Sequence, residues 1–203
     1  CPIYQTSLDS KLTGKIYSRV PIMILEAKDM VPERNEWGMT FATMFHMSND
    51  SHLFRERHEL EADGFCIDDN TFLKGDASFL PLYEAKMIYI WNQRHGDFRE
   101  TNGSRAHVLP STNTQLLRDS SYLPIPFYWV PKSEVEARLH DKGWTRKWLL
   151  GFRDISDARA SARTFISTII PLGGVSNKLP LLMTREKPEK AAALTANLSS
   201  LVF

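Results

Sequence analysis

Residues 146–183 constrain the fold of this chain more than any other segment. The run RKWLLGFRDI at 146–155 is bulky and apolar, and RTFISTIIP at 163–171 has the two-residue alternation of a β-strand. Gly173 and Gly174 then lead into VSNKLPLLM. Two strand-like runs joined by a glycine turn are typical of a hairpin, so this segment predicts an antiparallel or mixed sheet.

Two further strands and a long loop are predicted before this hairpin. The runs RVPIMIL at 19–25 and PFYWV at 126–130 are rich in residues that favour strands. Residues 96–126 lie ahead of the second run and contain repeated Gly, Pro, Ser, Thr and Asn, which predicts a loop. Loops of this length in a compact domain are usually either functional or disordered.

Helical spacing of apolar residues recurs in several other segments. Ser51 is a candidate N-cap for a helix ended by Gly64, and Ser133 with Glu136 forms a candidate capping box. The patterns together predict an α+β fold, with a mixed or antiparallel sheet, flanking helices and a C-terminal helix. The predicted helices span residues 37–45, 51–64, 81–91, 133–140 and 187–203.

Composition bounds the size and the environment of the fold. With 203 residues, 42% of them hydrophobic, the chain can bury one sizeable core. It contains no run of about 18 apolar residues and no secretion leader, so we expect a cytoplasmic protein without a membrane partner. Cys1 and Cys66 have no cysteine or histidine neighbours at zinc-ligand spacing, which argues against a thiolate metal site.

The two ends of the sequence indicate a piece of a longer protein. The chain starts on CPIYQTS without an initiator methionine, and its last residues, NLSSLVF, continue an apolar helical pattern that requires a partner surface. We therefore expect one domain over residues 1–185, followed by the truncated start of a helical segment over residues 186–203.

Charge is distributed unevenly although the formal net charge is only +1. Residues 50–84 carry nine acidic and three basic residues, whereas residues 85–163 carry thirteen basic and eight acidic ones. In the second segment the basic residues alternate with tyrosine, phenylalanine and tryptophan. This combination suits a polyanion such as DNA, and it equally suits a solvated face over an aromatic core.

Common enzyme motifs are missing from the sequence. There is no glycine-rich phosphate loop between a strand and a helix, and no Gly-x-Ser-x-Gly nucleophile turn. His46, His52 and His58 recur every six residues, a spacing that does not place all three on one helix face. We therefore assign no catalytic residue and no metal ligand on these grounds.

One pattern does fit a metal-dependent nuclease. Glu84 and Lys86 form a Glu-x-Lys motif, and Asp68, Asp69 or Asp76 could supply a second carboxylate for Mg²⁺. Such a site normally requires both motif residues on a strand, where side chains two apart share a face. Because the spacing around the motif favours a helix, on which they would diverge, the nuclease interpretation is an alternative.

Four ordered blocks of the sequence resemble a known family. They are WGMTFATMFHMSNDSHLF, GDASFLPLYEAKMIYIWNQR, FYWVP and WLLGFRDISDARASARTFISTIIPLGGVSNKLPLL. The region from residue 37 to 203 resembles the segment that follows the catalytic domain in large bacterial adenine-specific DNA methyltransferases. These enzymes, including type IIG-like ones fused to an endonuclease, serve restriction-modification and phage-defence systems, and the segment is their target recognition domain.

The resemblance implies that this chain recognises DNA and that catalysis takes place in another domain of the full-length protein. The family's S-adenosylmethionine loop and Asn-Pro-Pro-aromatic motif are absent here, so we expect no enzyme activity and no cofactor in this fragment. S-adenosylmethionine would bind the parent protein. The expected partners are double-stranded DNA and the methyltransferase domain of the same polypeptide, and a subunit-bridging scaffold is the other alternative.

Candidate DNA-binding residues follow from the loop, the resemblance and the glycine turn. Arg153 and Arg163 match the family most closely, although with Asp154 they would equally form a buried ion pair. Glu84 and Lys86 are expected to serve recognition or local structure. The predicted DNA-contacting residues are Arg94, Arg99, Arg105, Arg153, Arg163, Asn177 and Lys178.

Overall fold

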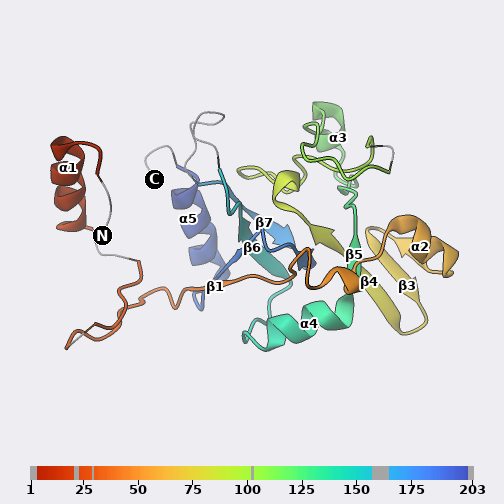
Figure 1. The fold of residues 1–203 in the computed structure, drawn as a ribbon, viewed down its shortest axis with the longest axis horizontal. Coiled ribbons are helices and arrows are strands. Elements are labelled where there is room, and N and C mark those ends of the chain that lie inside the picture. The colour runs from red at the N-terminus through yellow and green to blue at the C-terminus, as the bar shows by residue number, and fades with distance from the viewer. Residues whose placement is uncertain (1–3, 21–22, 29, 102, 157–164, 201–203) are drawn as a thin grey trace. The chain divides into compact units, whose positions relative to one another are not determined.

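The computed structural model describes residues 4–20, 23–28, 30–101, 103–156 and 165–200 (Figure 1). The chain divides into two compact units. The first comprises Cys1–Met39 with Thr184–Glu186, and the second comprises Thr40–Met183 with Lys187–Phe203. No helix in the described ranges is long and apolar enough to cross a membrane.

The described part of the first unit consists of one helix and an extended segment. Helix α1 (Ser7–Tyr17) begins with a capping box, in which the Thr6 hydroxyl accepts from the Asp9 amide and the Asp9 carboxylate accepts from the Thr6 amide. The strand predicted at 19–25 is wrong in the part that is described: only Leu25 pairs, through its backbone, with Arg34.

The second unit contains two sheets, which confirms the α+β class. In one sheet four antiparallel strands follow the order β1-β9-β6-β7. In the other, β2, β3, β4 and β5 are antiparallel and β8 pairs with β4 in parallel. The strands are β1 (Thr40–Ala42), β2 (Cys66–Asp68), β3 (Thr71–Lys74), β4 (Ala77–Tyr83), β5 (Trp129–Pro131), β6 (Trp148–Phe152), β7 (Ser167–Pro171), β8 (Gly174–Val175) and β9 (Leu181–Met183).

The helices of the second unit are short except for the last. The predicted C-terminal helix is confirmed: it packs against β7, and its buried residues include Ala191, Leu194 and Leu198. The helix predicted after Ser133 is also confirmed, although it begins after Pro131 and its side-chain cap is not formed. The helical elements are η1 (Ser51–Leu53), α2 (Arg57–Ala62), η2 (Ala85–Met87), α3 (Thr114–Arg118), α4 (Lys132–His140) and α5 (Pro188–Leu198).

Three predictions of local structure are wrong, and strand pairing explains each. The helix expected over 81–91 does not form: β4 continues to Tyr83, because β3, β5 and β8 all bond to it, and only the three-residue helical turn at Ala85–Met87 follows. The helix expected at 37–45 is replaced by β1 on the edge beside β9. The expected glycine hairpin does not form, since β8 leaves β7 and pairs with β4.

One core joins the two sheets to α4. It includes Phe45, Leu82 and Val130 together with Leu149 and Ile170, all essentially buried. Gly174 lies inside this core. A Cβ atom there would stand 2.5 Å from a Val130 methyl carbon and 3.1 Å from a Leu82 methyl carbon, so only glycine fits without movement.

We expect Gly174→Ala to lower the free energy of unfolding by about 1–3 kcal/mol, because the added methyl group overpacks a filled core. Urea denaturation measures this change. Gly14→Ala in α1 is the matched control, since nothing lies within 4 Å of its Cβ position and alanine favours a helix. An unchanged midpoint for Gly174→Ala would contradict this close packing.

Candidate nucleic-acid interface

The predicted loop forms the segment between η2 and β5, and Arg94 holds its far end. The Arg94 guanidinium donates to the backbone carbonyls of Leu117 at 3.0 Å, Asp119 at 2.8 Å and Tyr122 at 3.1 Å. These carbonyls lie at and beyond the C-terminal end of α3, where a helix leaves acceptors unpaired. Arg94 therefore gives the loop its shape, and three of the five N–H donors of its guanidinium are used in doing so.

A second anchor ties the middle of the loop to the end of β4. The carboxylate of Glu84, 9% exposed, lies 3.0 Å from Arg105 and 3.3 Å from Lys86. Lys86 also donates to the carbonyl of Ala106 and lies 4.9 Å from the centre of the Phe98 ring. The expected separation of Glu84 from Lys86 is wrong, because Glu84 follows a strand and Lys86 lies in η2.

This arrangement bears on the nuclease alternative. Two cations occupy the Glu84 carboxylate, which makes it a structural ion-pair partner. Asp68 ends β2, while Asp69 and Asp76 lie in the turns on either side of β3. Within the described ranges, no group of three His, Cys, Asp or Glu side chains is placed to hold a metal ion.

Arg99 has a side chain that is 44% exposed, slightly more than the 38% of Arg105, and unlike Arg105 it is not paired with the buried Glu84. Its backbone amide donates to Asp97, and its guanidinium lies 3.6 Å from the Asp97 carboxylate and 5.3 Å from the centre of the Tyr122 ring. The Tyr122 hydroxyl donates to Asp97 at 2.6 Å. Burial and this hydrogen bond raise the pKa of Tyr122. Arg99 is thus presented at the surface from a fixed support.

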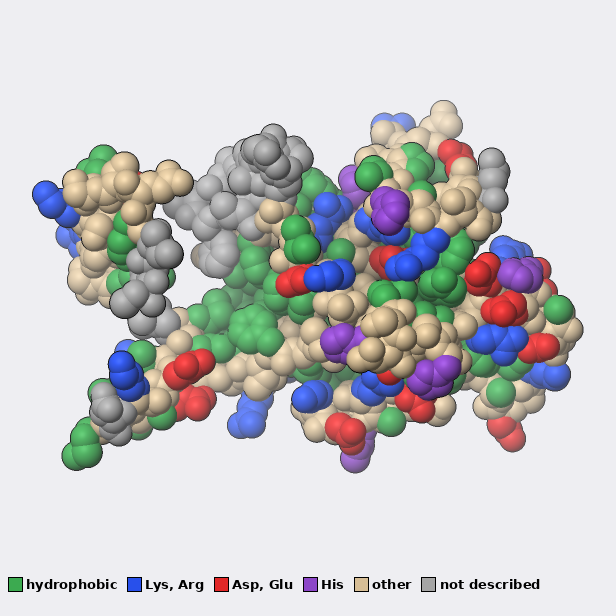
Figure 2. Space-filling view, viewed as in Figure 1, with side chains coloured by type: hydrophobic (Ala, Val, Ile, Leu, Met, Phe, Trp, Pro, Cys, Tyr) green, Lys and Arg blue, Asp and Glu red, His purple; other side chains and the backbone are tan. Residues whose placement is uncertain are grey.

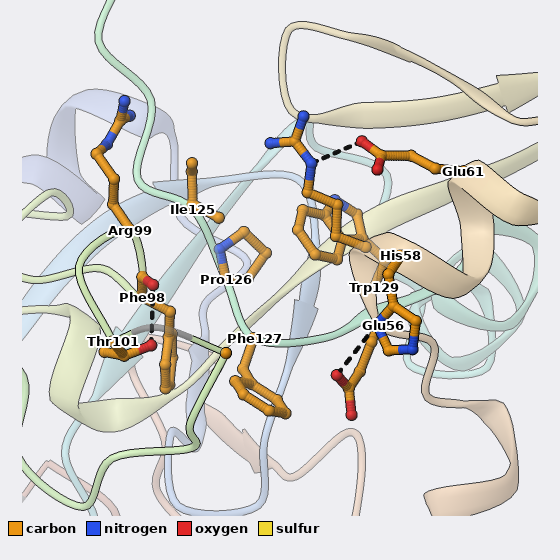
Figure 3. Close-up of a pocket in the computed structure, with 12 residues that line it drawn as sticks. Glu56, His58, Glu61, Phe98, Arg99, Thr101, Ile125, Pro126, Phe127 and Trp129 are labelled. Carbon is orange, nitrogen blue, oxygen red and sulfur yellow. Dashed lines mark hydrogen bonds and ion pairs between the residues drawn. The ribbon is translucent and has the colours of Figure 1, made fainter.

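A groove lies beside Arg99, between α2 and the loop. One hollow of about 430 Å³ is lined by both segments, and Figure 3 shows its apolar floor between the loop side chains and those of α2. A neighbouring hollow of about 440 Å³ shares four lining residues with the first. The shared residues are Arg57, Arg99, Ile125 and Trp129.

The sequence did not single out Arg57, which lies in the acidic segment. Its guanidinium pairs with Glu61 at 2.7 Å, and about half of its side chain is exposed. Trp129 closes the floor of the groove, where its indole N–H donates to the carbonyl of Asn70. No local pattern in the sequence joins Arg57 to Trp129 or to the loop, because they are far apart in the chain.

The remaining predicted contacts lie near the start of the loop and near β8. Arg153 donates to the carbonyl of Ile88 at 2.5 and 3.1 Å, and burial lowers its pKa. The expected pairing of Arg153 with Asp154 is replaced by a pair between Asp154 and Lys178 at 3.0 Å, with both side chains partly exposed. Arg163 lies outside the described residues.

Asn177 takes part in the core through its backbone. Its amide donates to the carbonyl of Phe45 at 2.7 Å, beside the buried end of β8. Its side-chain oxygen is buried and has no hydrogen-bond partner within the described structure. Lys178, the next residue, is exposed. Of this pair, Lys178 is therefore better placed to meet a phosphate.

Comparisons with protein-family models, with curated proteins and with solved structures found no match to this chain. The resemblance to target recognition domains therefore stays a prediction. A function for the chain has to be inferred from the geometry of the loop, the groove and the exposed cations.

Proposed function

We propose that this chain is the DNA target recognition domain of a site-specific adenine DNA methyltransferase from a restriction-modification or phage-defence system. The methyltransferase domain, with its S-adenosylmethionine and any fused endonuclease, would lie elsewhere in the same polypeptide. The observation that carries the proposal is the long loop, residues 96–126, held by Arg94 and Glu84 beside a groove that Arg99 lines with an exposed side chain.

A fixed loop suits the reading of DNA for a physical reason. Contacts to phosphates set the register of a protein on the duplex, and contacts to base edges then select the sequence. Both kinds of contact lose specificity if the contacting side chains move. Arg94, Lys86 and Arg105 bond within the domain and fix the loop, so that Arg99 and the exposed Arg118 of α3 can meet the duplex at defined positions.

The charge pattern supports a limited number of phosphate contacts. On the face in Figure 2, basic and acidic side chains are interleaved, without a broad patch of one sign. The α2 side of the groove carries Glu56 and Glu61, and carboxylates accept hydrogen bonds from the amino group of cytosine. We therefore expect affinity to come from a few arginines and lysines and not from a general positive field.

We expect the chain to bind duplex DNA with a dissociation constant of about 10⁻⁴ to 10⁻⁶ M at physiological salt. Arg99→Ala should weaken binding and reduce the slope of log K against log salt by about one, because one phosphate contact is lost. Fluorescence anisotropy with a labelled duplex of random sequence, titrated at several salt concentrations, measures both quantities.

The matched control is Lys142→Ala. Lys142 is exposed just beyond α4, and Figure 1 shows α4 and α3 on opposite sides of β4 and β5. This variant should keep the affinity and the salt slope of the original protein. Absence of duplex binding would overturn the proposed function and favour the scaffold alternative. An unchanged salt slope for Arg99→Ala would show that Arg99 does not contact the DNA.

A further inference from the structure

A tight turn at the start of the loop presents a tryptophan to solvent. Residues 89–92 form the turn, with backbone hydrogen bonds between Tyr89 and Asn92 of 2.8 and 3.0 Å. Trp91 occupies the tip, where its φ angle is +58° and its exposed fraction is 59%. A positive φ is unfavourable for a bulky L-residue, and exposure of an indole ring is unfavourable as well. Two unfavourable features thus coincide at one residue.

Trp91 differs in this respect from the other tryptophans of the chain. Trp129 and Trp144 are buried, while Trp37 and Trp148 are partly buried. All five lie in described parts of the chain, and Trp91 is the most exposed of them. Strained backbone persists where the surrounding structure enforces it, and such positions cluster at functional sites. The strain at Trp91 therefore points to a ligand for the exposed ring.

The base of the turn is held on several sides. Arg153 donates twice to the Ile88 carbonyl and lies 5.5 Å from the centre of the Tyr89 ring. His95 stacks on Tyr89 at 4.9 Å, and the amide of Arg94 donates to the Asn92 side chain at 2.9 Å. These contacts hold the backbone of the turn and keep Trp91 at its tip.

We propose that Trp91 is a base-stacking residue, whose ring lies against an exposed base face or wedges between base pairs of bound DNA. The inference rests on the proposed function and adds a contact that the sequence did not indicate. Every base has a flat face, so a rigid, exposed aromatic ring binds DNA by stacking without depending on the sequence. Wedging side chains that unstack a base step are a recurring device of DNA-bending proteins.

The neighbourhood of the turn favours a nucleic-acid partner over a protein one. Arg153 clamps the turn, and its neighbour Asp154 pairs with the exposed Lys178 and donates its amide to the Lys178 carbonyl. Lys178 is thus linked to the turn through Asp154 and Arg153, and about half of its side chain is exposed. Cations beside an aromatic platform are the combination by which proteins hold a nucleic-acid backbone while a base stacks.

The test compares three proteins in duplex binding. Trp91→Phe keeps a stacking ring, whereas Trp91→Asn removes the ring and places a residue that tolerates positive φ at the tip. We expect Trp91→Asn to bind about 5- to 150-fold more weakly, the range that corresponds to loss of one stacked base, while Trp91→Phe stays close to the original protein. Thermal unfolding should show that Trp91→Asn is at least as stable as the original protein, since asparagine tolerates the positive φ angle at this position.

Two further readouts report stacking itself. Addition of unlabelled duplex should quench the tryptophan fluorescence of the original protein, and this quenching should be lost in Trp91→Asn. A duplex with a single abasic site should bind more tightly than the intact duplex, because a gap in the stack is already open. Trp91→Asn should lose this preference.

The outcomes separate this inference from the proposed function. If the original protein binds duplex DNA and Trp91→Asn matches it in affinity and quenching, Trp91 does not stack and the recognition function stands. Equal losses for Trp91→Phe and Trp91→Asn would also overturn the stacking role. If the original protein binds no duplex at all, both proposals fall together.

Discussion

Replacement of Arg94 by alanine should loosen the loop at residues 96–126 while both sheets stay folded. Three backbone carbonyls would lose a charged donor at once, and each such hydrogen bond contributes on the order of 1.5–3 kcal/mol. Because Arg94 is only half-buried, water replaces part of this interaction, and we expect local opening of the loop to become easier by about 2–3 kcal/mol. Hydrogen exchange at residues 117–123 measures the change.

Two variants control for this effect. Arg94→Lys keeps the charge but cannot reach three separated carbonyls with one ammonium group, so an intermediate loss of protection is expected. Arg118→Ala removes an exposed arginine from α3, close in sequence to the same carbonyls, and should leave exchange unchanged. Equal protection in Arg94→Ala and the original protein would show that the loop is held by other contacts.

Removal of the Glu84 carboxylate is expected to be comparably damaging. Glu84→Ala leaves Lys86 and Arg105 facing each other without their shared anion. Breaking a fully buried ion pair typically costs about 3–5 kcal/mol, and the partial exposure of both cations reduces the expected loss to about 2–3 kcal/mol. Urea denaturation gives this value.

A double-mutant cycle with Arg105→Ala separates the ion pair from the packing of Glu84. We expect the effects of Glu84→Ala and Arg105→Ala on the free energy of unfolding to be non-additive, because Arg105 has already lost its ion-pair partner in Glu84→Ala. The same purified variants test the nuclease alternative. Mg²⁺-dependent plasmid cleavage by the original protein that disappears in Glu84→Ala, with stability unchanged, would make Glu84 a metal ligand and refute its structural role.

The parts of the fold that were predictable from the sequence are those with a clear local pattern. The bulky apolar run at 146–155 contains β6, the alternating run at 163–171 contains β7, and the last residues, with their helical spacing, contain α5. The helix predicted over 51–64 breaks into η1 and α2, because Arg55 pairs through its backbone with Trp129. A contact between residues so far apart in the chain has no local signature.

The candidate site was less predictable for the same reason. The carbonyls to which Arg94 donates lie 23 to 28 positions further along the chain, so no local pattern could indicate that Arg94 anchors the loop. Glu84 and Lys86 meet because β4 continues further than the helical spacing indicated. The sequence around Arg57 does not indicate a binding residue, because its neighbours are mostly acidic. In the fold, Arg57 lines the groove together with residues of the loop.

The pairing of β8 with β4 also determines when the domain can fold. Leu82 pairs with Gly174, and Thr40 at the start of the second unit pairs with Met183 near its end. Folding rates fall as contacting residues become more distant in the sequence, because the intervening chain must be ordered first. During synthesis, β4 stays without one of its neighbours until β8 has left the ribosome. The loop that follows β4 therefore gains its final support only when nearly the whole domain has been made.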